Sequence, residues 1–222
     1  MSTYFISYNL ACVAIWVYID ALVILHFCSP TTRGDHASLW RTVSLPLKIA
    51  QTAAFLEVFH AAAGWVRSNA ATAFVQVAAR NFVLWAVMDP FPSTRGSWAL
   101  PLCVGAWAAV EVPRYAYYVW ELVFGKGAAP FALAWLRYSL FIVLYPLGIL
   151  GEVGCILFAL PSAGSFAWNT SIGAGNALNV AYNHQLLLCL LLPLYIPATP
   201  LMIGHMWAAR GKWLKEHREK RA

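Results

Sequence analysis

The sequence predicts an all-α, polytopic membrane protein in which six transmembrane helices surround a buried tunnel. Of its 222 residues, 61% are hydrophobic and only 11% are charged, and the mean hydropathy is +0.62, whereas soluble domains are about half apolar. Apolar runs of about 20 residues recur along the chain, which is the length needed to cross a bilayer. A basic segment follows the last run, so residues 1–209 are interpreted as the transmembrane domain and residues 210–222 as a cytosolic tail.

The first half of the chain contains three of the predicted spans. The second of them is less hydrophobic and places Glu57 and His60 on one helical face, which predicts a polar stripe turned inward. The third places Gln76 and Arg80 one turn apart and ends at an Asp-Pro-Phe-Pro run. The three spans are residues 4–27, 45–66 and 71–88.

The second half contains the other three predicted spans. In the first of them, Glu111 and Arg114 are three residues apart and can pair along one helical face. Residues 161–179 are rich in Gly, Ser and Asn and predict a loop or a partly re-entrant segment. The last span is interrupted by three prolines. These spans are residues 98–124, 131–160 and 181–208.

The charge distribution predicts the orientation of the spans. Six basic and two acidic side chains in the last 13 residues give that segment a net charge of +4, and such segments stay on the cytosolic side. Six spans bring both ends of the chain to one side, so both termini are predicted to be cytosolic. The loop 161–179 would then be luminal, together with the glycosylation sequon Asn169-Thr170-Ser171. A nucleic-acid-binding arm is not expected this close to a membrane span.

The stretch Leu136–Glu152 carries the candidate site. Tyr138, Tyr145 and Glu152 are spaced by seven residues, almost two helical turns, and therefore point to nearly the same face. Pro146 should kink the helix beside Tyr145. An ionised carboxylate at membrane depth is costly unless it is paired, hydrated or retained for a function. Three glycines are expected to leave the facing side bare and open room for a ligand, and they are Gly148, Gly151 and Gly154.

This stretch, LRYSLFIVLYPLGILGE, resembles the signature of the microsomal 3-hydroxyacyl-CoA dehydratases, which are also called protein tyrosine phosphatase-like proteins. Four further segments resemble the other motifs of this family in the same order, and together the matches cover most of the chain up to Glu152. These segments are Tyr8-Asn9 with Trp16, Leu56 to Ser68, Gln76 to Trp85, and Trp107 to Tyr118.

The resemblance implies that the protein removes water from a long-chain (3R)-3-hydroxyacyl-CoA to give trans-2-enoyl-CoA during very-long-chain fatty acid elongation. It also implies an endoplasmic reticulum location and, as partners, the condensing enzyme and the ketoacyl and enoyl reductases. The two catalytic residues of the family map onto Tyr145 and Glu152. Dehydration needs a base for the α-proton and an acid for the β-hydroxyl. Our hypothesis makes Glu152 the base and Tyr145 the hydrogen-bond donor, and the opposite assignment stays open.

The sequence excludes phosphatase chemistry despite the second name of the family. The run that would correspond to the phosphatase loop begins at His60, and Ala61 occupies the position of the nucleophilic cysteine. Without a thiolate, no cysteinyl-phosphate intermediate can form.

Other polar residues have two interpretations each. Tyr138 and Arg137 either assist the site or steady the helix. Glu111 with Arg114, and Glu57 with His60, are either structural polar pairs or site residues. Three cations near helix ends are either membrane-interface anchors or contacts for the CoA phosphates, and they are Arg41, Arg67 and Lys126.

No cofactor is predicted, because the chemistry requires none and no nucleotide-binding fingerprint is present. No metal site is predicted either, because the histidines form no HxxxH or HExxH pattern. The substrate is expected to lie along the tunnel with its thioester near the cytosolic mouth. Two alternative functions are a catalytically silent scaffold of the elongation complex, which should lack Tyr145 or Glu152, and a small membrane transporter, which should show inverted repeats.

Overall fold

The computed structural model describes residues 2–66, 68–165, 169 and 181–219, and the predicted all-helical class is confirmed over these residues. η1 is a π-helix that continues α4, and η2 is a 3₁₀-helix between α9 and α10. The elements in chain order are α1 (Ser2–Cys28), α2 (His36–Ala53), α3 (Phe55–Ala62), α4 (Ala70–Phe82), η1 (Val83–Met88), α5 (Pro92–Arg95), α6 (Ala99–Phe124), α7 (Phe131–Ser139), α8 (Phe141–Ala163), α9 (His184–Leu191), η2 (Leu192–Leu194) and α10 (Tyr195–Glu219).

Four helical segments of the described chain are long and apolar enough to cross a membrane, and they are Ser2–Cys28, Ala70–Met88, Phe131–Ala163 and His184–Glu219. Large apolar side chains point outward from them. On α10, for example, Ile196 is 77% exposed and Leu201 is 74% exposed. Water would make such surfaces unfavourable, whereas hydrocarbon solvates them, so the structure is that of a membrane protein.

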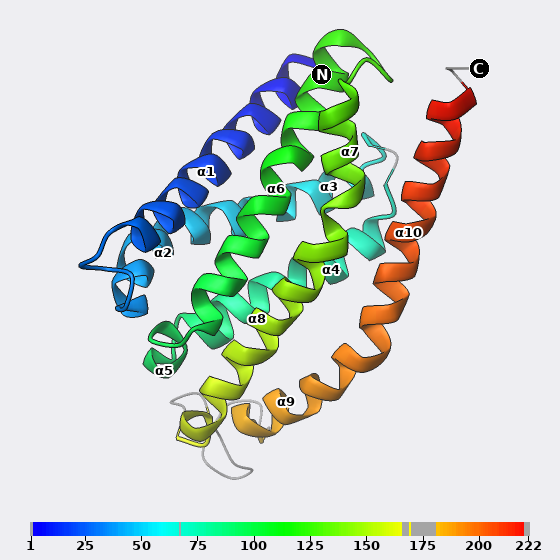
Figure 1. The fold of residues 1–222 in the computed structure, drawn as a ribbon. Coiled ribbons are helices and arrows are strands. Elements are labelled where there is room, and N and C mark those ends of the chain that lie inside the picture. The colour runs from blue at the N-terminus through cyan, green and yellow to red at the C-terminus, as the bar shows by residue number, and fades with distance from the viewer. Residues whose placement is uncertain (1, 67, 166–168, 170–180, 220–222) are drawn as a thin grey trace.

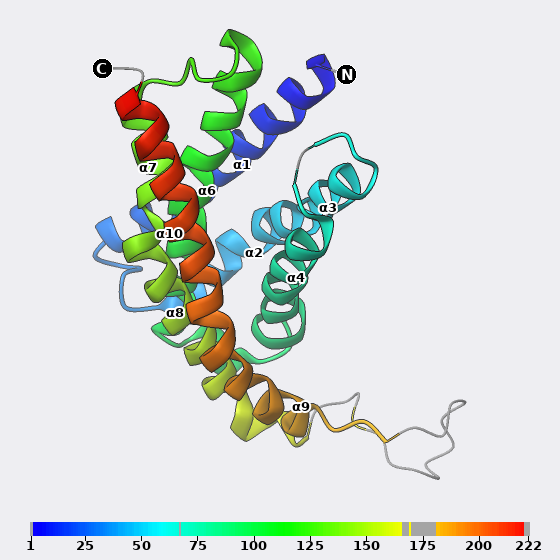
Figure 2. The same cartoon turned by 90° about the vertical axis from the view of Figure 1, so that its right-hand side faces the viewer.

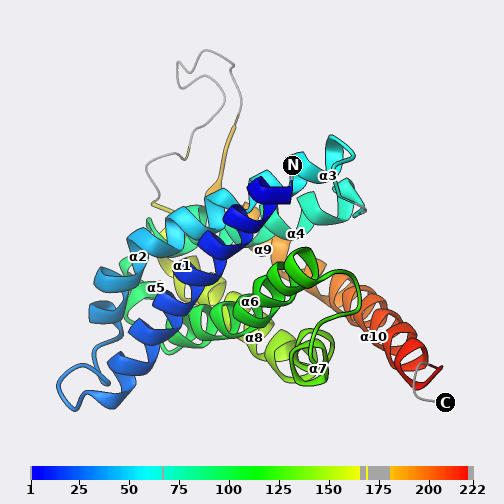
Figure 3. The same ribbon diagram turned by 90° about the horizontal axis from the view of Figure 1, so that it is seen from above.

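α6 is the central helix of the bundle and packs mainly on α1 and α8 (Figures 1 and 3). The start of α1 and the end of α10 lie toward the same end of the molecule, and α5 and α9 lie toward the other (Figure 1). α10 lies to one side of the other helices in Figure 1 and crosses in front of α7 and α8 in the turned view of Figure 2. None of its described residues is buried.

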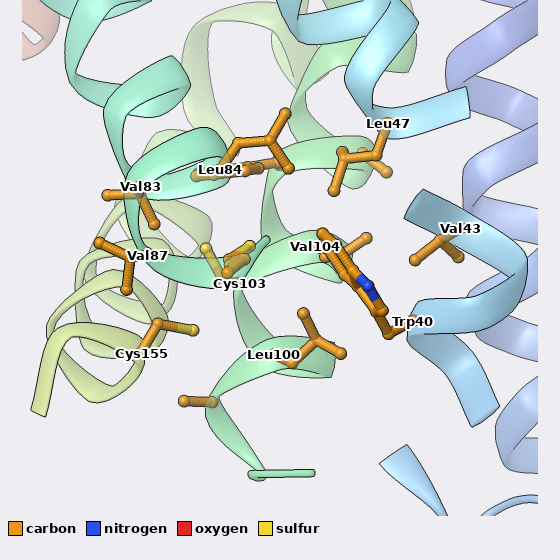
Figure 4. Packing of buried hydrophobic residues seen from close by; sticks show 14 of the residues in the cluster. Trp40, Val43, Leu47, Val83, Leu84, Val87, Leu100, Cys103, Val104 and Cys155 are labelled. Carbon is orange, nitrogen blue, oxygen red and sulfur yellow. The ribbon is translucent and has the colours of Figure 1, made fainter. Parts of the chain in front are cut away.

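The hydrophobic core fills the half of the bundle away from the start of α1. There α2, η1, α6 and α8 converge, with residues such as Leu47, Leu84 and Val104 completely buried (Figure 4). The other half, where α3, the end of α6 and α7 lie, is more polar and contains a cavity. This division places charged residues and open space at one end and dense apolar packing at the other.

The prediction that the glycines of α8 leave room for a ligand is wrong. A Cβ atom added to Gly151 would lie 2.7 Å from the backbone of Cys103, and one added to Gly154 would lie 2.7 Å from Cβ of Ala99. The glycine face is therefore occupied by α6. Small residues let two membrane helices approach closely, and close van der Waals packing is the main force that associates helices in lipid.

Helix interruptions differ from the predicted ones. The predicted span 45–66 is divided at Ala54 into α2 and α3, and the predicted fifth span is divided at Leu140 into α7 and α8. Helix α8 then continues through Pro146, and the kink predicted beside Tyr145 stays a prediction. In the last span, the predicted interruption is confirmed at Pro193, within η2. The predicted interruptions at Pro197 and Pro200 are wrong, because α10 runs as one helix from Tyr195 to Glu219. The domain boundary at residue 210 stays a prediction.

Candidate active site

Glu152 projects from the middle of α8 and is held by donors from two other helices. The indole Nε1 of Trp107 on α6 donates to one carboxylate oxygen at 2.9 Å. The hydroxyl of Tyr195 on α10 donates to the other oxygen at 2.9 Å. Each oxygen therefore has one donor and keeps lone-pair capacity for a further proton. The carboxylate is oriented and still able to react.

Tyr145 lies seven residues before Glu152 on the same helix, partly exposed. Their backbones are about 10 Å apart on a regular helix, so the two groups can bracket a substrate without touching. Among the described residues, the Tyr145 hydroxyl has no hydrogen-bond partner, so it is available to donate to a ligand.

A chain of charged residues leads away from Trp107. The guanidinium of Arg80 lies 5.0 Å from the centre of the Trp107 ring, in a cation–π arrangement. Arg80 also forms an ion pair with Glu111, which is only 3% exposed. The second oxygen of Glu111 lies 2.6 Å from Nε of Arg114, so the predicted pairing of these two residues is confirmed.

Arg114 continues the chain to the neighbouring helix. Its Nη2 lies 2.6 Å from Glu57 on α3, and the hydroxyl of Tyr115 donates to the same carboxylate oxygen. Two carboxylates and two guanidiniums thus neutralise one another, which is the arrangement that makes buried charges tolerable. We call the four residues Arg80, Glu111, Arg114 and Glu57 the ion-pair chain.

The ion-pair chain ends at a cavity of about 990 Å³, in the half of the bundle that contains the start of α1. Tyr138 lines this cavity, and its ring stacks on Trp213 of α10 at 5.3 Å between ring centres. Glu57 and Arg114 belong both to the cavity wall and to the ion-pair chain. Tyr145 and Glu152 are not among the described lining residues, so Tyr138 is the one member of its predicted group that lines the cavity.

The remaining predicted site residues have structural partners. Arg137 donates to the Tyr118 hydroxyl at 3.1 Å and lies over two tyrosine rings, so it steadies the cavity wall. His60 contacts the hydroxyl of Tyr4 at 2.9 Å. The interpretation of Glu57 and His60 as a mutual pair is wrong, because Arg114 and Tyr115 are the closer partners of Glu57.

The three cations assigned to helix ends fall in different places. Lys126 lies on the cavity wall. Arg41 forms an exposed ion pair with Asp35 at 3.2 Å, at the start of α2. Arg67 lies outside the described residues, as do Thr170 and Ser171 of the sequon. The side-chain amide of Asn169 donates to the carbonyls of Ala163 and Gly164, at the end of α8.

Sequence reasoning missed Tyr195. Its signal was weak but present, since it is the one polar group in the apolar run LLLPLYIP. The described residues contain no group of three or more His, Cys, Asp or Glu side chains able to hold a metal ion.

The comparisons with known proteins cover nearly the whole chain. Residues 51–216 match the family described as protein tyrosine phosphatase-like protein, PTPLA. The very-long-chain (3R)-3-hydroxyacyl-CoA dehydratase 2 of Mus musculus is 34% identical, over 98% of this chain and 83% of its own length. The dehydratase PASTICCINO 2B of Oryza sativa subsp. japonica is 35% identical over 87% of this chain and 86% of its own length. PASTICCINO 2 of Arabidopsis thaliana is 31% identical over 98% of this chain and 95% of its own length. No solved structure matches significantly.

Proposed function

The chain belongs to the protein tyrosine phosphatase-like (PTPLA) family, and on this premise we propose that it is a dehydratase of fatty acid elongation. Its substrate is a very-long-chain (3R)-3-hydroxyacyl-CoA, and its products are trans-2-enoyl-CoA and water. The observation that carries this proposal is the similarity to dehydratases of that name over up to 98% of the chain. The enzyme is therefore a carbon–oxygen lyase.

Glu152 and Tyr145 are the proposed catalytic pair. The Glu152 carboxylate takes the proton from C2, and the electron pair of that bond forms the double bond between C2 and C3. The C3–O bond breaks as Tyr145 donates its phenolic proton, so the hydroxyl leaves as water. After the products leave, Glu152 releases its proton to water and the Tyr145 phenolate takes one from water, which restores both groups. Support comes from the oriented carboxylate and from the unpartnered tyrosine hydroxyl among the described residues. The reverse assignment is the alternative.

The cavity is the proposed site for the CoA end of the substrate. Its volume of about 990 Å³ lies within the usual range for small-molecule sites, which is roughly 300–1,000 Å³. Tyr138 on its wall lies at the end of α7, and Tyr145 lies in the first turns of α8, seven residues later in the chain. A thioester arm that leaves the cavity along α7 and α8 would therefore arrive at the catalytic pair, and the acyl chain would continue between the helices.

Six membrane spans are proposed, because the helices run alternately between the two ends of the molecule (Figure 1). Four are the long apolar segments already described. The other two are α2 with α3, and α6, whose 26 residues would extend about 39 Å and exceed the bilayer core of about 30 Å. The charges on α6 are compatible with this, because Glu111 and Arg114 are paired inside the bundle. Both termini are proposed to be cytosolic, in the endoplasmic reticulum membrane.

The proposed partners follow from the chemistry of the substrate and the product. A reductase acting on a 3-ketoacyl-CoA must supply the hydroxy compound, and an enoyl reductase must consume the product. Together with the condensing enzyme, these are the proteins with which we expect association in the membrane.

The test is single-turnover dehydration of a long-chain 3-hydroxyacyl-CoA by the purified protein. We expect trans-2-enoyl-CoA from the wild type, and a rate lower by about 100-fold or more in Tyr145→Phe and in Glu152→Gln, because positioned acid–base groups contribute 10²–10⁴-fold. Product formation is followed by mass spectrometry.

Matched controls are Tyr18→Phe and Glu219→Gln, which change exposed side chains outside the site. They should keep the wild-type rate. An inactive wild type would contradict the dehydratase and favour the scaffold. Full activity in both site variants would agree with the dehydratase function but would contradict the assignment of Tyr145 and Glu152 as the catalytic pair.

A further inference from the structure

Tyr195 reaches the site because of a local break in the last membrane segment. Pro193 lies in η2, and α10 begins at Tyr195 directly after it. The change of direction between α9 and α10 turns the first residue of α10 toward α8. The Tyr195 hydroxyl is thereby placed 2.9 Å from Oε2 of Glu152, across 43 residues of sequence.

Trp107 approaches the same carboxylate from the opposite helix. Its side chain is 4% exposed, and its Nε1 lies 2.9 Å from Oε1 of Glu152. An indole nitrogen can only donate a hydrogen bond, so Trp107 must be the donor and Glu152 the acceptor in this contact. Arg80 covers the face of the indole ring and restricts its movement.

From these contacts we infer that Tyr195 and Trp107 are positioning residues that hold the Glu152 carboxylate in its reactive orientation. This rests on the proposed function of Glu152. Two donors on different oxygens, supplied by α6 and α10, prevent rotation of the carboxylate about its last bond. A base held in place costs no reorganisation when the proton is transferred.

The geometry also separates the roles of the two tyrosines. A phenol has a single proton to donate. Tyr195 donates its hydroxyl proton in the hydrogen bond to Glu152, whereas Tyr145 has no hydrogen-bond partner among the described residues. Tyr195 is therefore assigned to Glu152, and Tyr145 is left to donate to the departing hydroxyl.

A purely structural role is the competing explanation, because Tyr195 also ties α10 to the bundle. Other contacts share that task, and they include Arg210 with Ser139 at 3.1 Å and Trp207 with Phe141. The loss of a tether would appear as a lower Tm in Tyr195→Phe. A positioning residue acts only through the Glu152 carboxylate, so its effect must disappear when that carboxylate is removed.

The experiment is a double-mutant cycle with Tyr195→Phe and Glu152→Gln, measured as kcat and KM for dehydration of a long-chain 3-hydroxyacyl-CoA. In the wild-type background, Tyr195→Phe should lower kcat by about tenfold, the effect of one lost charge-assisted hydrogen bond, and leave KM within about twofold. In the Glu152→Gln background it should cause no further loss. Trp107→Phe, a second variant that keeps an aromatic ring, should behave in the same way.

Tyr18→Phe is the matched control, because Tyr18 is 55% exposed on α1. Wild-type kcat in Tyr195→Phe, or an equal loss in both backgrounds, would overturn this inference alone. A wild type that fails to dehydrate the substrate would overturn the proposed function and this inference with it.

Discussion

At the scale of single residues, charge pairing decides which groups are free to bind the substrate. Within the ion-pair chain, Arg80 is paired with Glu111, and Arg114 is paired with both Glu111 and Glu57. Lys126 lies on the cavity wall and has no ion pair among the described residues. It is therefore the cation best placed to meet the CoA phosphates in the proposed substrate complex.

We predict that Lys126→Ala raises KM for a 3-hydroxyacyl-CoA by about threefold to tenfold, the effect of losing one partly solvated charge contact. KM for the corresponding pantetheine thioester, which lacks the nucleotide, should not change. Steady-state kinetics with both substrates measure this difference.

Lys215→Ala is the matched control for that prediction. Lys215 is an exposed lysine of α10 outside the cavity lining, and its side chain is 81% exposed. The KM of the Lys215→Ala variant should equal that of the wild type for both thioesters. If Lys126→Ala raised KM equally for both thioesters, the assignment of Lys126 to the CoA phosphates would be contradicted.

At the scale of elements, the contact between α6 and α8 positions the site. Gly151 and Gly154 let α8 approach α6 so closely that a methyl group would not fit. The same approach brings Trp107 on α6 within hydrogen-bond distance of Glu152 on α8. Packing and the geometry of the proposed site therefore depend on the same helix pair.

We predict that Gly151→Ala destabilises the protein by about 1–3 kcal/mol, because its Cβ would overlap the backbone of α6 and force the helices apart. Gly148→Ala is the matched control, since its Cβ would lie at an ordinary 3.7 Å from Ala106. Thermal unfolding in detergent should give a lower Tm for the first variant only. Equal Tm values would show that the helix pair can adjust without cost.

At the scale of the whole molecule, the helices pass back and forth between two ends. The connections after α1 and η1 lie toward the end that contains α5 and α9, and the connection between α6 and α7 lies toward the end where α1 starts (Figure 1). The cavity lies toward the end where α1 starts. We propose that this end faces the cytosol, where soluble CoA thioesters are found.

The proposed orientation predicts which positions react with a membrane-impermeant maleimide in closed vesicles whose cytosolic face is outward. In a Cys189→Ser background, a cysteine introduced by Lys126→Cys should be labelled at once. Cys28, which is exposed at the end of α1, should be labelled only after the membrane is permeabilised.

Buried Cys12, Cys103 and Cys155 provide the internal control, because they should stay unlabelled in the folded protein. Mass spectrometry of the labelled peptides identifies each site. Labelling of Cys28 in closed vesicles would contradict the assignment of the two sides.

The sequence by itself determined the helical class and the positions of most apolar segments, because these depend on local composition and on helical spacing. The proposed Tyr145–Glu152 pair came from the resemblance of its motif to that of the family. It did not determine the division at Leu140, the contact of the glycine face with α6, or the cavity that Tyr138 lines. Tyr195 and Trp107 reach Glu152 across 43 and 45 residues of chain. Such contacts arise only when α6, α8 and α10 pack together, and no local pattern states which side chains will then meet.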